Sequence, residues 1–176
     1  MVFEELLFDE GTIRQKRFSY FDGEGDQVAT LDRPQKGLTV DELFFVVRGL
    51  PVPFLAPGET RSLPFLPALD RVRMLHKPLA WVEGKLTRST KTQTRTTAFG
   101  RYVVDTYEAE VGADRYRFEV ERAFPNRLIA WEGPQGEQAE LLGSERMPYW
   151  QLNGEGQEKA LEKLGLRPPA GLAASR

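Results

Sequence analysis

The sequence predicts a single mostly-β domain, an antiparallel β-barrel or half-barrel (meander) with one buried helix near residues 40–50 and a short C-terminal helix. Three observations predict this fold. After residue 70, apolar and polar residues alternate with the period of two that is typical of half-buried strands. Over the whole chain, about seven to nine strands are expected at regular spacing with turn residues between them. Residues 38–58 alone break the pattern, with an apolar helical stretch followed by a proline-rich segment.

Composition limits the class of protein. The 176 residues suit one domain over residues 1–176, and a chain of this length buries roughly 70% of the surface of its unfolded form. The net charge of −2 gives no general attraction to nucleic acid, so we expect no nucleic-acid partner. No apolar run reaches the length of about 18 residues that spans a bilayer, so we expect no membrane-spanning segment.

Cysteine is absent, and the only histidine is His76. These two facts exclude disulfides, thiol nucleophiles, iron–sulfur sites and cysteine-ligated zinc. We therefore expect no metal, no cofactor and no catalytic residue that can be assigned, and a non-catalytic protein is favoured over an enzyme. A Ser-His-Asp triad would have to use His76, and no serine or aspartate partner is indicated by the spacing.

The N-terminal part predicts a hairpin over residues 13–21 and 27–31, joined by a Gly- and Asp-rich turn. The helix that follows begins with Thr39 and Glu42 at the spacing of a capping box. Its apolar residues lie on more than one side, so we expect it to be buried on most faces, covering the apolar face of the sheet. Gly49 and Pro51 end the helix, and the prolines after it favour an extended segment.

Strands dominate the second half of the chain. They are predicted over residues 71–76, 79–97, 101–111, 115–121, 127–131 and 138–142, the last extending towards Trp150 in one interpretation. An Asn-Gly turn at residues 153–154 precedes a short helix over residues 157–164, with Gly165 just past its end.

Residues 41–58 also carry a family resemblance. The pattern Asp41-Glu-Leu-Phe, Arg48-Gly-Leu-Pro and Pro57-Gly58 resembles the helix-and-loop signature of the domain of unknown function 3108 family, exported bacterial proteins of unassigned activity. Residues 82–84, 100–104 and 126–131 are similar to successive strands of that family, and residues 149–153 to a C-terminal element of some members. The resemblance covers residues 18–166 and implies a β-rich exported domain. It implies no catalytic residues, because the family has no assigned active site.

One basic stretch has two interpretations. No acidic residue occurs between Gly84 and Val104, so the basic side chains there form a local stripe. The stripe is either an anion-binding surface or a solvated strand pair whose charge discourages edge-to-edge pairing. In the second case, acidic residues further along the chain would lie across the sheet from it: Glu132, Glu137, Glu140 and Glu145.

The aromatic residues are the main evidence in the sequence for a bound ligand. They supply more apolar surface than a small meander needs, and a barrel of about eight strands holds one small ligand. The candidate ligand-binding residues are Phe44, Phe54, His76, Trp81, Trp131 and Trp150. The same residues would also serve as core, so both a cavity beneath Phe44 and Phe54 and a filled interior stay open. For His76, the alternatives are a ligand contact, a histidine packed in or near the core, and a histidine exposed at a strand end beside Lys77 and Pro78.

These observations lead to an expected function. We expect a non-catalytic bacterial envelope protein that binds an apolar or amphipathic ligand, such as a lipid or another hydrophobic small molecule. The alternative is an interaction or assembly module with an envelope protein as its partner, and a hydrolase using carboxylates or His76 is the third class. The acidic N-terminus lacks a basic signal-peptide region. We therefore expect the periplasm or cell envelope if a signal peptide was removed, and otherwise the cytoplasm.

Overall fold

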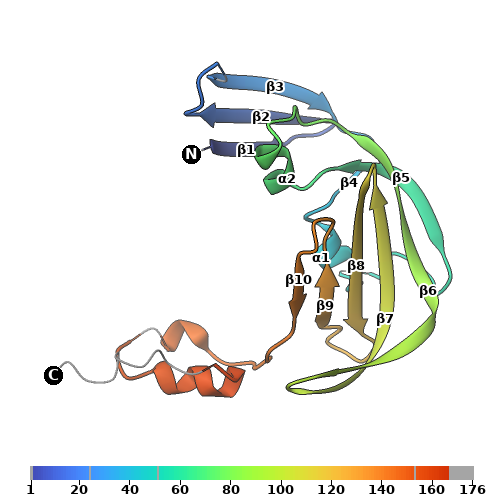
Figure 1. Cartoon of the computed structure of the whole chain (residues 1–176), viewed down its shortest axis with the longest axis vertical. Coiled ribbons are helices and arrows are strands. Elements are labelled where there is room, and N and C mark those ends of the chain that lie inside the picture. Colours follow the sequence, from blue (N-terminus) through green and yellow to red (C-terminus); the bar gives the residue numbers. More distant parts are fainter. Residues whose placement is uncertain (1, 24, 51, 153, 167–176) are drawn as a thin grey trace.

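The computed structural model describes residues 2–23, 25–50, 52–152 and 154–166, and it contains two sheets (Figure 1). The smaller sheet has the order β1-β2-β3 and is antiparallel throughout. The larger sheet has the order β10-β9-β8-β7-β6-β5-β4. Its neighbours pair antiparallel, except that β4 runs parallel to β5. The seven-stranded sheet is curled, which confirms the predicted half-barrel.

The small sheet comprises β1 (Val2–Phe8), β2 (Thr12–Ser19) and β3 (Asp26–Asp32). The large sheet comprises β4 (Leu38–Thr39), β5 (Thr60–Leu66), β6 (Val82–Thr97), β7 (Gly100–Val111), β8 (Asp114–Glu121), β9 (Leu128–Glu132) and β10 (Gln138–Glu140). The helical elements are α1 (Leu43–Val46), α2 (Leu69–Met74) and the 3-10 helices η1 (Tyr149–Gln151) and η2 (Glu158–Leu164). Among the described residues, none of the helices is long and apolar enough to cross a membrane.

Helix α1 begins at the predicted capping box. The backbone N–H of Thr39 donates to Glu42 Oε2 at 2.7 Å, and the N–H of Glu42 donates to Thr39 Oγ1 at 3.1 Å. Gly49 has a φ of 70° just beyond the helix, as expected for a residue that ends it. The α-helical segment is shorter than predicted, and it is not buried on most faces, because Phe45 on its outer side is 59% exposed.

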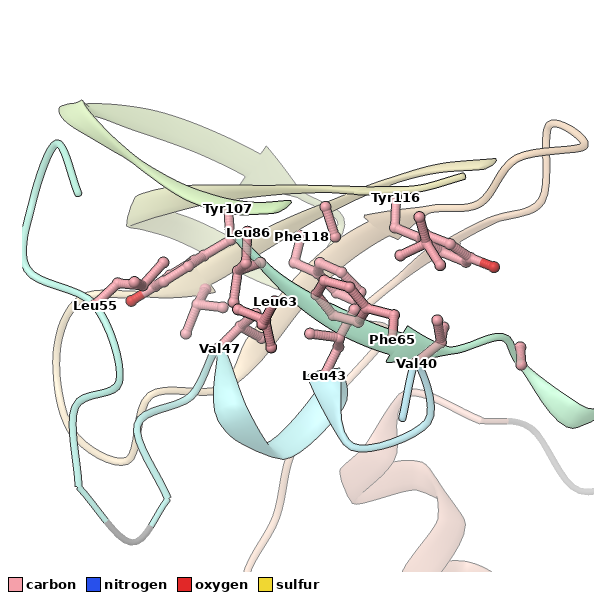
Figure 2. Close-up of a cluster of buried hydrophobic side chains, with 14 residues drawn as sticks. Val40, Leu43, Val47, Leu55, Leu63, Phe65, Leu86, Tyr107, Tyr116 and Phe118 are labelled. Atoms are coloured by element: carbon pink, nitrogen blue, oxygen red, sulfur yellow. The ribbon is translucent and has the colours of Figure 1, made fainter. Parts of the chain in front are cut away.

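The main core lies between the inner face of the large sheet and α1 (Figure 2). Leu43 from α1 and Val47, directly after this helix, point into this cluster, where Phe65 and Phe118 extend from the sheet. Leu43, Phe65 and Phe118 are fully buried. The predicted covering helix is therefore confirmed, and its inner side fills the space beneath the sheet.

The predicted strand over residues 71–76 is wrong, because this segment begins within α2. A second core cluster is formed by Ile13, Leu66, Val72 and Leu79. Leu69, three residues before Val72 and on the same side of the helix, packs against this cluster. Met74 is 68% exposed, so it is not the second inward-facing residue of a strand. The second cluster joins the small sheet to the large one, and this tertiary contact decides in favour of the helix.

The other predicted strands are close to those observed, and the C-terminal helix is the 3-10 helix η2, followed by Gly165 with a φ of 71°. Strands β1, β4 and β5 were not predicted, and β10 ends at Glu140 rather than continuing towards Trp150. The turn predicted at residues 153–154 involves Asn153, which lies outside the described residues. The acidic complement to the basic stretch is confirmed in one pair, since Arg95 Nη2 lies 2.8 Å from Glu140 Oε2.

Candidate functional site

A cleft of about 250 Å³ opens at the edge of the main core, where the residues before α1, the start of α2 and the turn between β9 and β10 come together. We call it the aromatic–acidic cleft. Its lining combines apolar, aromatic and charged side chains: Val40, Asp41, Phe44, Ala68, Asp70, Arg71, Tyr116, Trp131, Pro134 and Glu137.

The apolar wall of the cleft is an extension of the core. The ring of Phe44 meets the ring of Phe118 edge-on at a centroid distance of 5.4 Å and that of Trp131 at 5.5 Å. Such T-shaped contacts are the favoured geometry of aromatic pairs. Phe118 is fully buried, whereas Phe44 and Trp131 are half-buried and line the cleft. Phe44 thus links the centre of the molecule to the cleft surface.

Tyr116 supplies a polar group that the fold does not use. Its side chain comes from β8 and is only 7% exposed, and Figure 2 shows its hydroxyl at the outer end of the cluster, away from the core residues. Among the described residues the hydroxyl has no hydrogen-bond partner. Burial raises the pKa of Tyr116 to about 12, so the phenol is neutral at physiological pH.

Three carboxylates, those of Asp41, Asp70 and Glu137, border the cleft. Burial raises the pKa of Asp41, and the negative charges of Asp70 and Glu42 add to this effect. The backbone N–H of Leu69, at the start of α2, opposes it by hydrogen bonding to the Asp41 carboxylate. Asp70 accepts a hydrogen bond from the backbone N–H of Arg71 at 2.7 Å. Glu137 accepts one from the backbone N–H of Gln135 at 2.7 Å.

Arg71, the basic residue in the lining of the cleft, forms an ion pair with Asp114. Arg71 Nη2 donates to Asp114 Oδ1 at 3.0 Å and Nε to Oδ2 at 3.4 Å, so the pair is bidentate and mostly buried. The hydrogen bond to Asp114 raises the pKa of Arg71. Within the described part of the chain, Asp41, Asp70 and Glu137 form no salt bridge. The cleft therefore carries negative charge that its own arginine does not balance.

A second cleft, of about 550 Å³, lies beside β4 and the start of β5. Phe54 and Leu63 belong to its lining, together with the basic residues Lys36 and Arg61. The Arg61 guanidinium lies 4.4 Å above the centre of the Phe54 ring and is paired with Glu59 at 2.5 Å. Because Arg61 is already engaged on both sides, little of its charge is available to a ligand in this cleft.

The structure divides the six ligand-binding residues predicted from the sequence. Phe44 and Trp131 meet in the aromatic–acidic cleft, whereas Phe54 lines the second cleft. Trp81 donates its indole N–H to the Asp32 carbonyl at 2.8 Å and packs against the second core cluster.

The other two lie elsewhere. Trp150 is 64% exposed on η1, in T-shaped contact with Tyr149 at 5.4 Å. His76 follows α2 with a φ of 51°, is exposed, and meets the Phe21 ring edge-on at 4.9 Å. The interpretation of His76 as an inward-facing strand residue is therefore wrong, because the segment is not a strand.

Sequence reasoning missed Asp41, Asp70 and Tyr116 as site residues. Asp41 reads as a favourable charge in the first turn of a helix, and Tyr116 as one of the apolar positions of β8. Their proximity depends on how α2 packs against the residues before α1, and a strand in place of α2 hides it. An aspartate directly after the buried Val40 and two positions before the buried Leu43 is the one local signal that could have drawn attention to this position.

Among the described residues, no three histidine, aspartate or glutamate side chains are grouped closely enough to hold a metal ion. Comparison of the chain with protein-family models, with curated proteins and with solved structures finds no match.

Proposed function

We propose that the protein is a non-catalytic binding protein for a small amphipathic ligand, which occupies the aromatic–acidic cleft. One observation carries this proposal: Phe44 and Trp131 line the same cleft as Tyr116, whose hydroxyl has no hydrogen-bond partner among the described residues. Binding sites typically combine an apolar lining with a few polar groups that orient the ligand. Because the Tyr116 hydroxyl has no partner within the described part of the chain, it is available for a hydrogen bond with a ligand.

The volume limits the size of the ligand. Sites for drug-sized ligands usually measure about 300–1,000 Å³, and this cleft measures about 250 Å³. It therefore accommodates a compact molecule or the polar end of a lipid, with any acyl chain lying outside. The space beneath the large sheet is occupied by Leu43, Phe65 and Phe118, which favours the cleft over a ligand enclosed in the half-barrel.

Fluorine NMR tests this proposal directly. The three tryptophans stand in different places, with Trp131 in the cleft, Trp81 at the second core cluster and Trp150 exposed on η1. Protein labelled with fluorotryptophan gives three resonances, which the three Trp→Phe variants assign. Titration with a panel of compact amphipathic compounds is expected to shift the Trp131 resonance saturably and leave that of Trp150 unchanged.

A matched variant makes the test specific. Phe44→Leu keeps the apolar volume but removes the aromatic wall, so it is expected to weaken any binding detected at Trp131 while the chain stays folded. If no compound in the panel shifts Trp131 up to millimolar concentration, the proposed function is incorrect.

An assembly module is the second candidate function, and the edge strand β10 favours it. All three residues of Gln138–Glu140 are exposed, and in the described residues β10 pairs only with β9. An exposed edge can accept a strand of a partner protein through main-chain hydrogen bonds. The backbone hydrogen bonds from Gly133 to Glu137 and from Leu141 to Ile129 place the N–H of Ala139 toward β9 and that of Gln138 at the free edge. Gln138→Pro would therefore remove one main-chain donor from this edge. Loss of a stoichiometric partner from a cross-linking pull-down with this variant would support assembly.

An envelope location is part of the proposal and is supported by the resemblance of residues 41–58 to an exported family. Fractionation of cells that express the complete open reading frame tests it. Recovery of the protein in the cytoplasmic fraction alone would refute this location without affecting the binding proposal.

A further inference from the structure

We infer that the ligand of the aromatic–acidic cleft is an organic cation, a protonated amine attached to an apolar body. The inference rests on the proposed function and adds the chemical class of the ligand. Three features carry it: the charge that borders the cleft, the kind of hydrogen-bonding groups it offers, and the aromatic wall beside them.

The charge of the cleft favours a cation. Asp41, Asp70 and Glu137 border it and form no salt bridge with any described residue. The only cation in the lining, Arg71, is neutralised by Asp114 through two hydrogen bonds. An anionic ligand would meet three carboxylates and a guanidinium whose Nε and Nη2 already donate to Asp114, so that only the buried Nη1 lacks a partner. A cation would relieve the repulsion between Asp41 and Asp70, which is one of the causes that raise the pKa of Asp41.

The hydrogen-bonding groups match an ammonium. An alkylammonium has three N–H donors and no acceptor. The carboxylates of the cleft are acceptors, and the Tyr116 oxygen, which lacks a partner among the described residues, is one more. Tyr116 is more than nine-tenths buried, so its oxygen reaches a ligand only through the cleft.

The aromatic wall completes the match. The rings of Phe44 and Trp131 are in edge-on contact, with a distance of 5.5 Å between their centroids, and both residues line the cleft. Aromatic faces attract cations, with Trp the strongest, and they also bury the apolar body of an amphipathic amine. A bare metal ion fits less well, because the carboxylates do not form a group of metal ligands within the described residues.

Three probes of similar size and different charge test the inference: phenylethylamine, phenylethanol and phenylpropanoate. Binding is followed by the Trp131 fluorine resonance and by calorimetry at neutral pH and low salt. We expect phenylethylamine to bind at least about tenfold more tightly than phenylethanol, since a charge-assisted hydrogen bond contributes about 1.5–3 kcal/mol. We expect phenylpropanoate to bind most weakly.

Variants assign the charge effect to the cleft. Asp41→Asn keeps the side-chain size and an acceptor oxygen, and it is expected to weaken phenylethylamine binding about tenfold or more while leaving phenylethanol binding unchanged. Glu137→Gln, on the rim, is expected to act in the same direction. The matched control is Glu5→Gln on β1, which removes the same charge outside the cleft and is expected to have no effect.

The outcomes separate the two proposals. If phenylethanol or phenylpropanoate binds as tightly as phenylethylamine, the cleft binds ligands but the inference of a cation is overturned. If no probe of any charge shifts Trp131, both proposals fail. Dodecylamine and dodecanoate are added as long-chain probes of opposite charge. Tighter binding of dodecylamine than of phenylethylamine identifies the ligand as a lipid-like amine whose charged end lies in the cleft. Equal binding of the two amines identifies the ligand as a free small amine.

Discussion

Asp41 is the residue at which stability and the proposed function are opposed. The residue is exposed, but partial desolvation raises its pKa, so in the range between the ordinary and the raised pKa the folded state binds more protons than the unfolded state. The free energy of unfolding therefore falls as the pH rises through that range. Below the ordinary pKa the carboxyl is protonated in both states, and no cost is present.

We predict that Asp41→Asn is at least as stable as the unchanged protein at pH 7, and that the difference disappears at acidic pH. Thermal unfolding of both proteins across this pH range measures it. A lower melting temperature for the variant at pH 7 would show that the hydrogen bond with the backbone of Leu69 outweighs the cost of burial.

Glu121 and Arg127 form an ion pair with the opposite behaviour. The Arg127 guanidinium donates to both Glu121 oxygens, at 2.7 and 2.8 Å, and this lowers the pKa of Glu121. The stability from the pair is fully present above the ordinary pKa of glutamate and is lost as the pH falls through the lowered value.

We predict that Glu121→Gln lowers the free energy of unfolding at pH 7 by about 2 kcal/mol, the usual contribution of a hydrogen bond to a charged group. The deficit is expected to shrink below the ordinary pKa of glutamate, as measured by urea unfolding. Glu110→Gln is the control, because the ion pairs of Glu110 with Lys85 and Arg115 are exposed and their loss costs less than about 0.5 kcal/mol. Equal losses in the two variants would contradict the argument.

At the scale of elements, Gly84 fixes how closely β5, β6 and β7 approach one another. A Cβ at this position would lie 2.6 Å from Phe65 Cδ2 and against the carbonyl oxygen of Glu110. Phe65 is fully buried in the main core, so it has no room to move aside.

We predict that Gly84→Ala destabilises the protein by about 2 kcal/mol or more, as overpacking in a core does. Chemical unfolding measures the change. Gly154→Ala serves as the control, since no atom lies within 4 Å of its added Cβ. A loss in the control as large as that in Gly84→Ala would mean that the steric argument fails.

Helices and strands could be predicted from the sequence where the local pattern of apolar and polar residues favours the same structure as the tertiary contacts. Tyr116, Phe118 and Val120 alternate with charged residues, and β8 forms as predicted. The alternation of Val72, Met74 and His76 is equally regular, yet the segment begins as a helix because Leu69 and Val72 pack together into the second cluster. The pattern at β1 is irregular, and that strand exists through its pairing with β2.

On the scale of the whole molecule, two clusters of unequal size hold the fold together. The main cluster holds α1 against the large sheet, and the smaller one, with Leu66 and Leu79, joins the two sheets. Figure 1 shows η1 and η2 beyond β10, to one side of both sheets. Neither of these 3-10 helices contains a buried residue.

We predict that removing residues 143–176 changes the free energy of unfolding by less than about 1 kcal/mol, in the range of surface changes. Leu79→Ala, within the smaller cluster, is expected to cost at least about 2 kcal/mol. Circular dichroism melts compare the two. Failure of the shortened chain to fold would show that contacts such as that between Gly165 and the Phe99 ring are needed.

Only the aromatic residues of the candidate site could be predicted from the sequence, because the other residues are brought together by tertiary contacts. Phe44 and Trp131 are conspicuous in the sequence because large aromatics are the usual lining of an apolar site. Asp41, Asp70 and Tyr116 meet only after α2 has packed beside the residues that precede α1, and no spacing along the chain records that contact. The half-barrel is confirmed by the structure, whereas the family resemblance and the envelope location stay predictions.

The double contact of Phe44 has a consequence for how this protein diverges in evolution. Phe44 touches Phe118 in the core and Trp131 in the cleft, so a change there alters stability and ligand together. Asp70 and Glu137 lie at the rim, where substitutions are nearly neutral for folding. Homologues that retain the fold are therefore expected to keep an aromatic residue at position 44 and to vary at positions 70 and 137, so that new specificities arise at the rim.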